Sequence, residues 1–519
     1  MNIKLIGFIY CAISIILLEC NSAIAQENDK SLAFKKNRPQ KKYTIFYQPD
    51  LSYQIQKQFN LIRDANAGIP LAQHELGLRY LLGEDGLKAD TVKGAYWVGK
   101  AAEQSITAAC YNYGILLING WGVDWNPYKA FDYFMKAAKD GMAQAQYFFG
   151  MLHTDNLIVK KNYLEAYGWI KKAAEQNFQP AIDTKKELEK YLPPGFLRDS
   201  SNFAIHIQPD STVNSETSFS SHVGLVFIDF DAVQDTIQKV EDKQLIEDLF
   251  HEFNMRLADS LNLKIGDSSF INIPPDKILE LLTYAEYGNS EALTIIGRFY
   301  ESGTFFEKNS IKASLNYLLA SQLSYPKAKF LLLKMLSNDF INDLIYEIKT
   351  SKNPEAMFVF YGLWSLGLYN QIIKDEAIKY LNESANQEFL TSMIELGQSY
   401  YSGKGTDNKK SITIWERAAL TGSVQAKLRL SATNIFDGTF YEPIEKSILN
   451  LKSAVEYGSV LAQIALAYAY ENGIGVQKNK AEAVKYYRYA AQRGNLTGYT
   501  ELKRLYDEIR PSEKRFMVN

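Results

Sequence analysis

Glycines followed by lysines near the end of the chain are the residues whose types and spacing first suggest chemistry. In the stretch ENGIGVQKNKAEA, Gly473-Ile474-Gly475 precedes Lys478. Closely spaced glycines let backbone N–H groups surround a phosphate, and a lysine adds positive charge. A dinucleotide fingerprint needs a third glycine three positions on, where this chain has Lys478, and the P-loop pattern is missing. We therefore predict a turn that ends a helix, with no nucleotide or other cofactor.

Acidic residues between positions 201 and 275 suggest a second chemistry. Val223 to Phe230 is apolar and β-branched enough for a strand, and Asp229 and Asp231 stand at its end. This pattern resembles the strand-Asp-x-Asp motif of haloacid dehalogenase-type phosphatases, which would make Asp229 a nucleophile and Asp231 an acid–base group. The Gly-Thr that follows in that family is missing, and the segment is too short for its fold. A hydrolytic activity here is therefore only an alternative.

Three of the five histidines, His206, His222 and His251, lie in the same segment. A metal site needs ligands that converge. On a continuous strand, however, His222 and Asp229 point to opposite faces. His251-Glu252 also lacks the second histidine of a zincin helix. We therefore expect no catalytic residue and no metal ligand, and a metal-dependent insert is kept as the alternative to a chain that is not an enzyme.

Much of the remaining chain repeats itself. The stretch NGWGVDWNPYKAFDYFMKAAKDG matches residues 472–494, so Gly473 and Gly475 have counterparts. Further copies show a small residue five positions before a glycine and a later pair of alanines, and neighbouring copies lie 34 to 37 residues apart. The signature positions are Ala72, Gly77, Ala109, Gly114, Gly120, Gly122, Ala137, Ala145, Gly150, Gly397, Gly403, Gly405, Gly473, Gly475 and Ala490.

Each repeat predicts two helices joined by a turn, because small and apolar residues recur at helical spacing on both sides of the glycines. Pro127 fits the first position of a second helix. The glycine inside the first helix costs about 1 kcal/mol relative to alanine, so we predict that it admits the partner helix at close range. An Asn or Asp that can cap the second helix stands 11 residues before the alanine pair in six copies, namely Asp90, Asn126, Asn162, Asn309, Asp407 and Asn479.

These features together resemble the Sel-1-like repeat, a relative of the tetratricopeptide repeat. The resemblance rests on Ala-x-x-x-Leu-Gly, the Gly-x-Gly-Val turn, Lys/Glu-x-Ala, an aromatic pair and Ala-Ala, over residues 67–181 and 288–495. It implies an all-α fold, a right-handed αα-superhelical solenoid in two arrays, here interrupted by a small α/β element. It also implies a scaffold that binds other proteins. The copies near 324–388 are degenerate, and Gly362 is one position from its expected place.

The start of the chain predicts export. Lys4, an apolar run from Leu5 to Leu18 and Ala23-Ile24-Ala25 form a secretory signal peptide, which implies a periplasmic or secreted protein. The run is shorter than the roughly 20 residues of a membrane-spanning helix, and no later stretch is long and apolar enough. A lipoprotein anchor at Cys20 is the less favoured alternative, because Glu19 precedes it.

The composition and the repeats divide the chain into five parts. They are a signal peptide (1–25), a flexible tail (26–50), an N-terminal array (51–195), a small α/β insert or connector (196–275) and a C-terminal array (276–511). The formal net charge of −2 gives no reason to expect a nucleic acid partner. Without Cys11 and Cys20, Cys110 is left alone, so packing and not a disulfide must stabilise the fold.

A solenoid presents a long curved groove, which suits binding of protein segments better than catalysis. We therefore predict a non-catalytic scaffold with protein partners. The candidate groove residues stand two or six positions after the leading alanine of a first helix, and they are His74, Tyr111, Tyr147 and Arg298. The alternative is that they pack against the next repeat. Carbohydrate binding in the envelope is a further alternative, with Trp121 and Trp125 exposed beside a turn.

Overall fold

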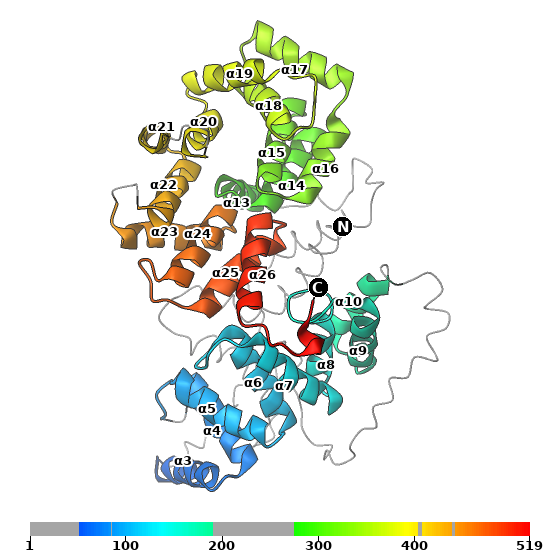
Figure 1. Ribbon diagram of the computed structural model, residues 1–519, viewed down its shortest axis with the longest axis vertical. Coiled ribbons are helices and arrows are strands. Elements are labelled where there is room, and N and C mark those ends of the chain that lie inside the picture. The colour runs from blue at the N-terminus through cyan, green and yellow to red at the C-terminus, as the bar shows by residue number, and fades with distance from the viewer. Residues whose placement is uncertain are drawn as a thin grey trace. The chain divides into compact units, whose positions relative to one another are not determined.

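The structure is a computed structural model that describes residues 51–84, 86–189, 192, 275–402, 407–438 and 442–518. Every regular element in these residues is a helix, which confirms the all-α prediction for the part described (Figure 1). The signal peptide, the tail, the insert with its candidate aspartates and histidines, and the turn glycines Gly403 and Gly405 lie outside the described residues.

The described residues form two compact units. The first unit contains the helices before the insert together with the end of the chain from Lys503 onward. Its helices are α3 (Leu51–Asn66), α4 (Pro70–Leu82), α5 (Thr91–Glu103), α6 (Thr107–Asn119), α7 (Pro127–Lys139), α8 (Ala143–Met151), α9 (Tyr163–Glu175), α10 (Gln179–Glu189) and the short 3-10 helix η3 (Lys514–Phe516).

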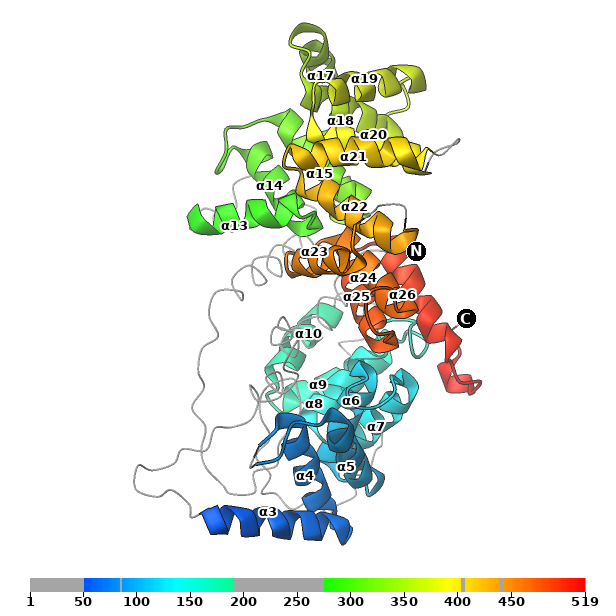
Figure 2. The same ribbon diagram turned by 90° about the vertical axis from the view of Figure 1, so that its left-hand side faces the viewer.

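Within the described residues, the second unit begins at Pro275 and ends at Leu502, within α26 (Leu496–Glu508). Its other helices are α13 (Pro275–Glu286), α14 (Ser290–Ser302), α15 (Ser310–Gln322), α16 (Pro326–Met335), α17 (Asn338–Thr350), α18 (Pro354–Ser365), α19 (Lys374–Asn386), α20 (Leu390–Ser402), α21 (Asn408–Leu420), α22 (Val424–Phe436), α23 (Ile444–Glu456), α24 (Val460–Asn472) and α25 (Lys480–Gln492). Consecutive helices pack in pairs, as α20 and α21 do in Figure 2, and the pairs stack into a helical solenoid.

The six predicted N-caps are all confirmed. Asp90 and Asn126, for example, accept a hydrogen bond from the backbone N–H three residues later, each at 2.9 Å. Asn162, Asn309, Asp407 and Asn479 cap their helices in the same way. Pro127 occupies the start of α7, as predicted. These bonds satisfy N–H groups that have no partner inside the helix, so they fix where each second helix begins.

The glycine within the first helix of a repeat lies where that helix crosses its partner. This confirms the prediction that glycine allows the two helices to approach closely. A β-carbon added at any of these glycines would lie too close to a side chain of the paired helix. The pairs are Gly77 with Val98, Gly114 with Phe134, Gly150 with Ile170, Gly297 with Tyr317 and Gly397 with Trp415. The cost of glycine in a helix is therefore offset by close helix packing.

Gly473 ends α24 in the left-handed conformation, with φ of 76°, and its N–H donates to Ala469 O at 2.8 Å. Gly120 ends α6 in the same way, with φ of 62°, and Gly122 has φ of 69°. Positive φ angles favour glycine because it lacks a β-carbon. The Gly-x-Gly stretch is thus a helix-ending turn, as its position after a helix predicts.

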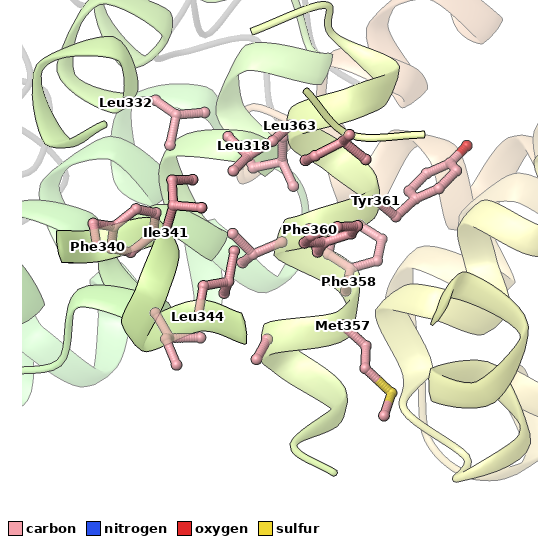
Figure 3. Packing of buried hydrophobic residues seen from close by; sticks show 14 of the residues in the cluster. Leu318, Leu332, Phe340, Ile341, Leu344, Met357, Phe358, Phe360, Tyr361 and Leu363 are labelled. Atoms are coloured by element: carbon pink, nitrogen blue, oxygen red, sulfur yellow. The ribbon is translucent and has the colours of Figure 1, made fainter. Parts of the chain in front are cut away.

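The degenerate copies pack differently from the others. A large apolar cluster joins α15, α16, α17, α18 and α19, with Leu332, Ile341 and Phe360 among its members (Figure 3). Within it, Gly362 of α18 lies against Leu318 of α15, whereas the five first-helix glycines named above face the second helix of their own pair. The shift of Gly362 along the sequence therefore corresponds to a different packing partner.

The second unit curves until its first helices contact its last ones. Tyr287, after α13, stacks on Tyr457, after α23, with ring centroids 4.4 Å apart. Asn289 Nδ2 donates to Tyr457 O at 3.2 Å, and Arg493 Nε lies 3.2 Å from Glu291 Oε2. Figures 1 and 2 both show α13 beside the orange helices. This array thus closes on itself, a feature that the repeat pattern does not predict.

None of the helices in the described ranges is long and apolar enough to cross a membrane.

Candidate functional site

Three of the four candidate groove residues are buried in the first unit. His74, Tyr111 and Tyr147 are 1%, 0% and 2% exposed. Asn112 Nδ2 of α6 lies 2.9 Å from His74 Nε2 of α4, which joins two successive repeats. The structure therefore does not place these side chains on an open surface. Helical spacing predicts that these side chains face away from their own pair. They contact the neighbouring pair instead, and the Tyr111 ring also lies 5.8 Å from that of Phe134 in its own pair.

The rings of the two tyrosines show the same packing. Tyr111 of α6 contacts Phe148 of α8, with centroids 5.9 Å apart. The Tyr147 hydroxyl lies 3.2 Å from Thr184 Oγ1 of α10. In both cases the partner belongs to the next repeat, which agrees with the packing alternative.

Arg298, the fourth candidate, lies in the other unit and is not brought together with the first three. It forms an ion pair with Glu301 at 2.9 Å, and both side chains are 15% exposed. Glu301 also accepts a hydrogen bond from the Tyr317 hydroxyl at 2.5 Å. Arg298 thus supports the contact between α14 and α15 and leaves little surface for a partner.

The tryptophans expected to be exposed are buried instead. Trp121 and Trp125 are 9% and 8% exposed. The Trp125 ring packs edge-on against Tyr506, with centroids 5.1 Å apart. Trp169 and Trp415 are also buried, and Trp97 and Trp364 are partly buried. The prediction that Trp121 and Trp125 are exposed is therefore wrong, and a carbohydrate site built on them loses its support.

A different set of polar side chains forms a strip across α15, α18, α20 and α22 of the second unit. This polar strip consists of Gln322, Tyr361, Glu395, Gln398 and Arg429. Glu395 Oε1 accepts from the Tyr361 hydroxyl at 3.2 Å, and Glu395 Oε2 accepts from Gln322 Nε2 at 3.4 Å. Figure 3 shows the Tyr361 hydroxyl at the outer end of a ring that points away from the apolar cluster.

Repeat geometry places two members of the polar strip side by side. Glu395 stands three residues after Ser392 in α20, and Arg429 stands three residues after Ala426 in α22. Ser392 and Ala426 are the leading small residues of two successive repeats, and both are fully buried. Equivalent positions in stacked repeats lie next to each other. A polar residue at this position in consecutive repeats is a signal that the sequence analysis missed.

Within the polar strip, the positive charge of Arg429 is only partly balanced by a hydrogen bond and by the Glu395 carboxylate. Its Nη1 donates to Gln398 Oε1 at 2.8 Å, while its buried Nε has no hydrogen-bond partner within the described part of the chain. Burial lowers the pKa of Arg429, and the Glu395 carboxylate opposes that shift. Among the described residues, no carboxylate lies within ion-pair distance of this guanidinium. A partly buried cation of this kind favours an added acceptor, such as a carboxylate.

The described ranges contain no cluster of three or more His, Cys, Asp or Glu side chains that could hold a metal ion. Burial and then the Glu395 carboxylate raise the pKa of Tyr361, so its hydroxyl stays protonated and donates. The polar strip therefore provides donors and one partly compensated cation, which is a set of groups for binding and not for proton transfer.

Five segments of the chain match the family model described as Sel1 repeat. They are residues 70–106, 107–142, 143–178, 391–423 and 460–495. The chain is also similar to the chitin synthase regulator SKT5 of Malassezia restricta, with 26% identity over 170 residues. That match covers 30% of this chain and only 12% of the length of the other protein.

Two solved structures show further similarity. One is a protective antigen of uropathogenic Escherichia coli strains that displays an SLR fold, with 21% identity, a TM-score of 0.30, and coverage of 90% of this chain and 84% of that one. The other is a Sel1 repeat protein from Oxalobacter formigenes, with 30% identity, a TM-score of 0.24, and coverage of 25% and 98%. The five matched segments are divided between the two units. Sel1 repeats therefore occur in both units of this chain.

Proposed function

We propose that this chain is a non-catalytic scaffold that binds protein segments in the cell envelope or outside the cell. Sel1 repeat proteins generally mediate protein–protein interaction, and five such repeats are present here. In a stacked array each repeat contacts only its neighbours, so the array offers an extended surface and no single point at which reacting groups converge. This arrangement suits recognition of a chain segment.

The observation that carries the proposal is the partly compensated charge of Arg429 within the polar strip. Its guanidinium uses Nη1 for Gln398 and keeps the buried Nε without a partner inside the described ranges. Partly buried N–H groups that lack an acceptor within the protein can bind acceptor groups of another protein. We assign the polar strip as the main contact surface of the second unit.

The partner chemistry follows from the groups that the strip presents. Arginine binds carboxylates through two parallel N–H···O bonds, which gives direction as well as energy. Tyr361 and Gln398 add neutral hydrogen-bonding groups to the same strip. The partner segment therefore carries an acidic side chain or a terminal carboxylate that meets Arg429, flanked by groups that bond to the neighbouring hydroxyl and amide.

Export is part of the proposal and rests on the start of the sequence. Lys4, the apolar run from Leu5 to Leu18 and Ala23-Ile24-Ala25 support a signal peptide that is removed before Gln26. N-terminal sequencing of the protein recovered from its source cells tests this part. A mature chain that begins at Gln26 supports export, whereas a chain that retains Met1 contradicts it.

The experiment that tests the scaffold is an affinity capture from envelope and secreted material of the source cells, read by mass spectrometry. The intact chain and the Arg429→Gln variant serve as baits. Arg417→Gln is the matched control, because Arg417 also pairs with a single residue, Glu388 at 2.9 Å, but is 55% exposed. We expect a protein captured by the intact chain and the control but lost with Arg429→Gln.

A third bait that lacks residues 201–275 separates the scaffold from the alternative of an active insert. A partner that persists with this bait belongs to the helical arrays. A partner that is lost with the deletion and kept by Arg429→Gln would overturn the assignment to the polar strip. In that case, metal analysis and hydrolase assays of the insert would follow.

A further inference from the structure

The last residues of the chain are buried against the first unit by an aromatic side chain. Residues from Lys503 onward belong to this unit, and Phe516 in η3 is only 1% exposed. Its ring packs edge-on against Tyr128 and Phe131 of α7, with centroid distances of 5.0 and 5.6 Å. The burial of Phe516 therefore indicates a surface shaped to receive it.

A single arginine connects the terminal segment to the loop between α8 and α9. Arg510 donates from Nη2 to Leu157 O at 2.6 Å and from Nη1 to Ile158 O at 3.1 Å. It also donates to Phe516 O at 2.8 Å and to Asp507 Oδ1 at 2.6 Å, both within its own segment. Arg510 thus holds the segment in shape and attaches it to the array, and charged donors make the stronger hydrogen bonds.

A second arginine sets the position of the segment along α7. Arg515 forms a two-bond ion pair with Asp132, with Nη1 to Oδ1 at 2.6 Å and Nη2 to Oδ2 at 3.1 Å. The two side chains are 40% and 36% exposed. Exposed pairs contribute little to stability, but two parallel bonds fix orientation. The pair therefore determines register more than affinity.

Comparison with a neighbouring repeat shows that α7 is specialised for this contact. Tyr128 stands two residues after the cap Asn126, and Val92 stands two residues after the cap Asp90 at the start of α5. Val92 is 66% exposed, whereas Tyr128 is 3% exposed. The Tyr128 hydroxyl donates to Tyr506 O at 3.0 Å. The terminal segment thus covers an aromatic position whose counterpart in α5 lies open.

We propose that α7 carries a peptide-binding site and that residues 503–518 occupy it as a ligand supplied by the same chain. The site, here called the α7 docking face, consists of Tyr128, Phe131 and Asp132 with the carbonyls of Leu157 and Ile158. The occupant binds through its arginines and Phe516. When substitutions prevent the chain's own segment from binding, an added peptide of the same sequence takes its place. This site is separate from the polar strip and does not depend on it.

An added peptide can occupy the α7 docking face only after residues 503–518 of the same chain no longer bind it, because these residues are covalently joined to the site. A ligand joined to its site by the chain has an effective concentration of the order of mM. A free peptide at μM concentration therefore competes poorly with the intact chain. Substituting the residues that contact the face, while leaving the face unchanged, removes this competition.

The test uses the full chain with Arg510→Ala and Phe516→Ala, and a fluorescent peptide of residues 503–519. Anisotropy is expected to show that the peptide binds the double variant at least tenfold more tightly than the intact chain. A peptide with the same two substitutions is expected not to bind. Lys514→Ala is the matched control, because Lys514 lies in the same turn but is exposed, and it should behave like the intact chain.

Charge reversal gives a second, independent measurement. Asp132→Arg in the double variant should weaken binding of the peptide, and a peptide with Arg515→Asp should restore it. Phe516→Ala alone replaces the double variant if the latter loses its helical circular dichroism. Equal binding of the peptide to the intact chain and to a folded variant would overturn the proposal, as would equal binding of the substituted peptide.

Discussion

The ring of Phe134 in α7 occupies the space that a β-carbon on Gly114 in α6 would need. Such a carbon would lie 2.7 Å from Phe134 Cε1 and 2.9 Å from Cδ1 and Cζ. Contacts this short do not occur between real side chains, so one of the two helices would have to move. Phe134 is fully buried and stacks on Phe148 at 5.3 Å, which leaves its ring no free space to shift.

Enlarging Gly114 should therefore destabilise the first unit. Gly114→Leu is expected to cost roughly 1–3 kcal/mol through overpacking, and Gly114→Ala should cost less. The measurement is the free energy of unfolding in urea, followed by tryptophan fluorescence. An unchanged unfolding midpoint for Gly114→Leu would contradict the packing explanation.

Gly99 offers a matched control within a helix of the same unit. A β-carbon there would meet the far end of the Tyr113 ring at 3.0 to 3.4 Å, a side chain that is not fully buried. Alanine is favoured over glycine in helices by about 1 kcal/mol, so Gly99→Ala should be neutral or stabilising.

Replacing Phe134 by leucine should reduce the cost of Gly114→Ala if the ring is the obstacle.

Removing an N-cap should weaken the helix that it starts. Asn126 Oδ1 accepts from Lys129 N at 2.9 Å and precedes Pro127, which has no N–H to donate. Asn126→Ala is expected to cost about 1 kcal/mol, and Asn126→Asp should retain most of the stability. Urea unfolding of both variants checks this. If the two substitutions have the same effect, the cap bond is not the cause.

Cys110 should resist alkylation until the first unit unfolds. Its side chain is fully buried, and Sγ donates to Ala102 O at 3.4 Å. Burial raises the pKa of Cys110 to about 11, so only about one thiol in a thousand is ionised at pH 8. Iodoacetamide labelling of a Cys11→Ser/Cys20→Ser chain, read by mass spectrometry, is expected to follow unfolding in urea.

An exposed thiol provides the comparison for that labelling. Ser399 in α20 is exposed, so Ser399→Cys in the same background should react without denaturant. Rapid labelling of Cys110 in the folded chain, at a rate near that of the introduced thiol, would show that the first unit opens far more readily than its packing implies.

Local features of the fold could be predicted because their partners are close in the sequence. An N-cap bonds to a residue three positions later, and a turn glycine bonds back to the helix that it ends. The glycine crossings were also predictable, since the paired helix follows directly. Helical direction, by contrast, does not predict that the Tyr111 ring packs against both Phe134 of its own pair and Phe148 of the next pair.

The candidate surfaces depend on contacts that no local pattern specifies. The bond between Gln322 and Glu395 joins residues 73 positions apart across the degenerate copies, where the register of the repeat shifts. The bond between Arg510 and Leu157 joins residues 353 positions apart. Such pairs depend on the curvature of an array and on the path of the chain end, which composition and spacing do not determine.

A pH-dependent loss of stability is expected from His153, which follows α8. Its Nδ1 lies 2.8 Å from Phe149 O, and its ring contacts those of Phe131 and Phe149, with centroid distances of 5.8 and 4.9 Å. Burial lowers the pKa of His153, although the Phe149 carbonyl and the Glu165 carboxylate oppose the shift. The unfolded chain therefore binds a proton at this site at a higher pH than the folded chain does.

It follows that the folded state loses stability as the pH falls below the ordinary histidine value of about 6.5 and towards the lowered folded pKa. His153→Asn removes the titration and can keep the bond, because Asn119 makes the same bond to a carbonyl four residues earlier at 2.8 Å. Urea midpoints of the two proteins should differ by a constant amount above pH 7. Between pH 6.5 and 5 the intact chain should lose stability faster than the variant. Parallel curves over that range would contradict this prediction, because they would show that His153 binds protons equally in the folded and unfolded states.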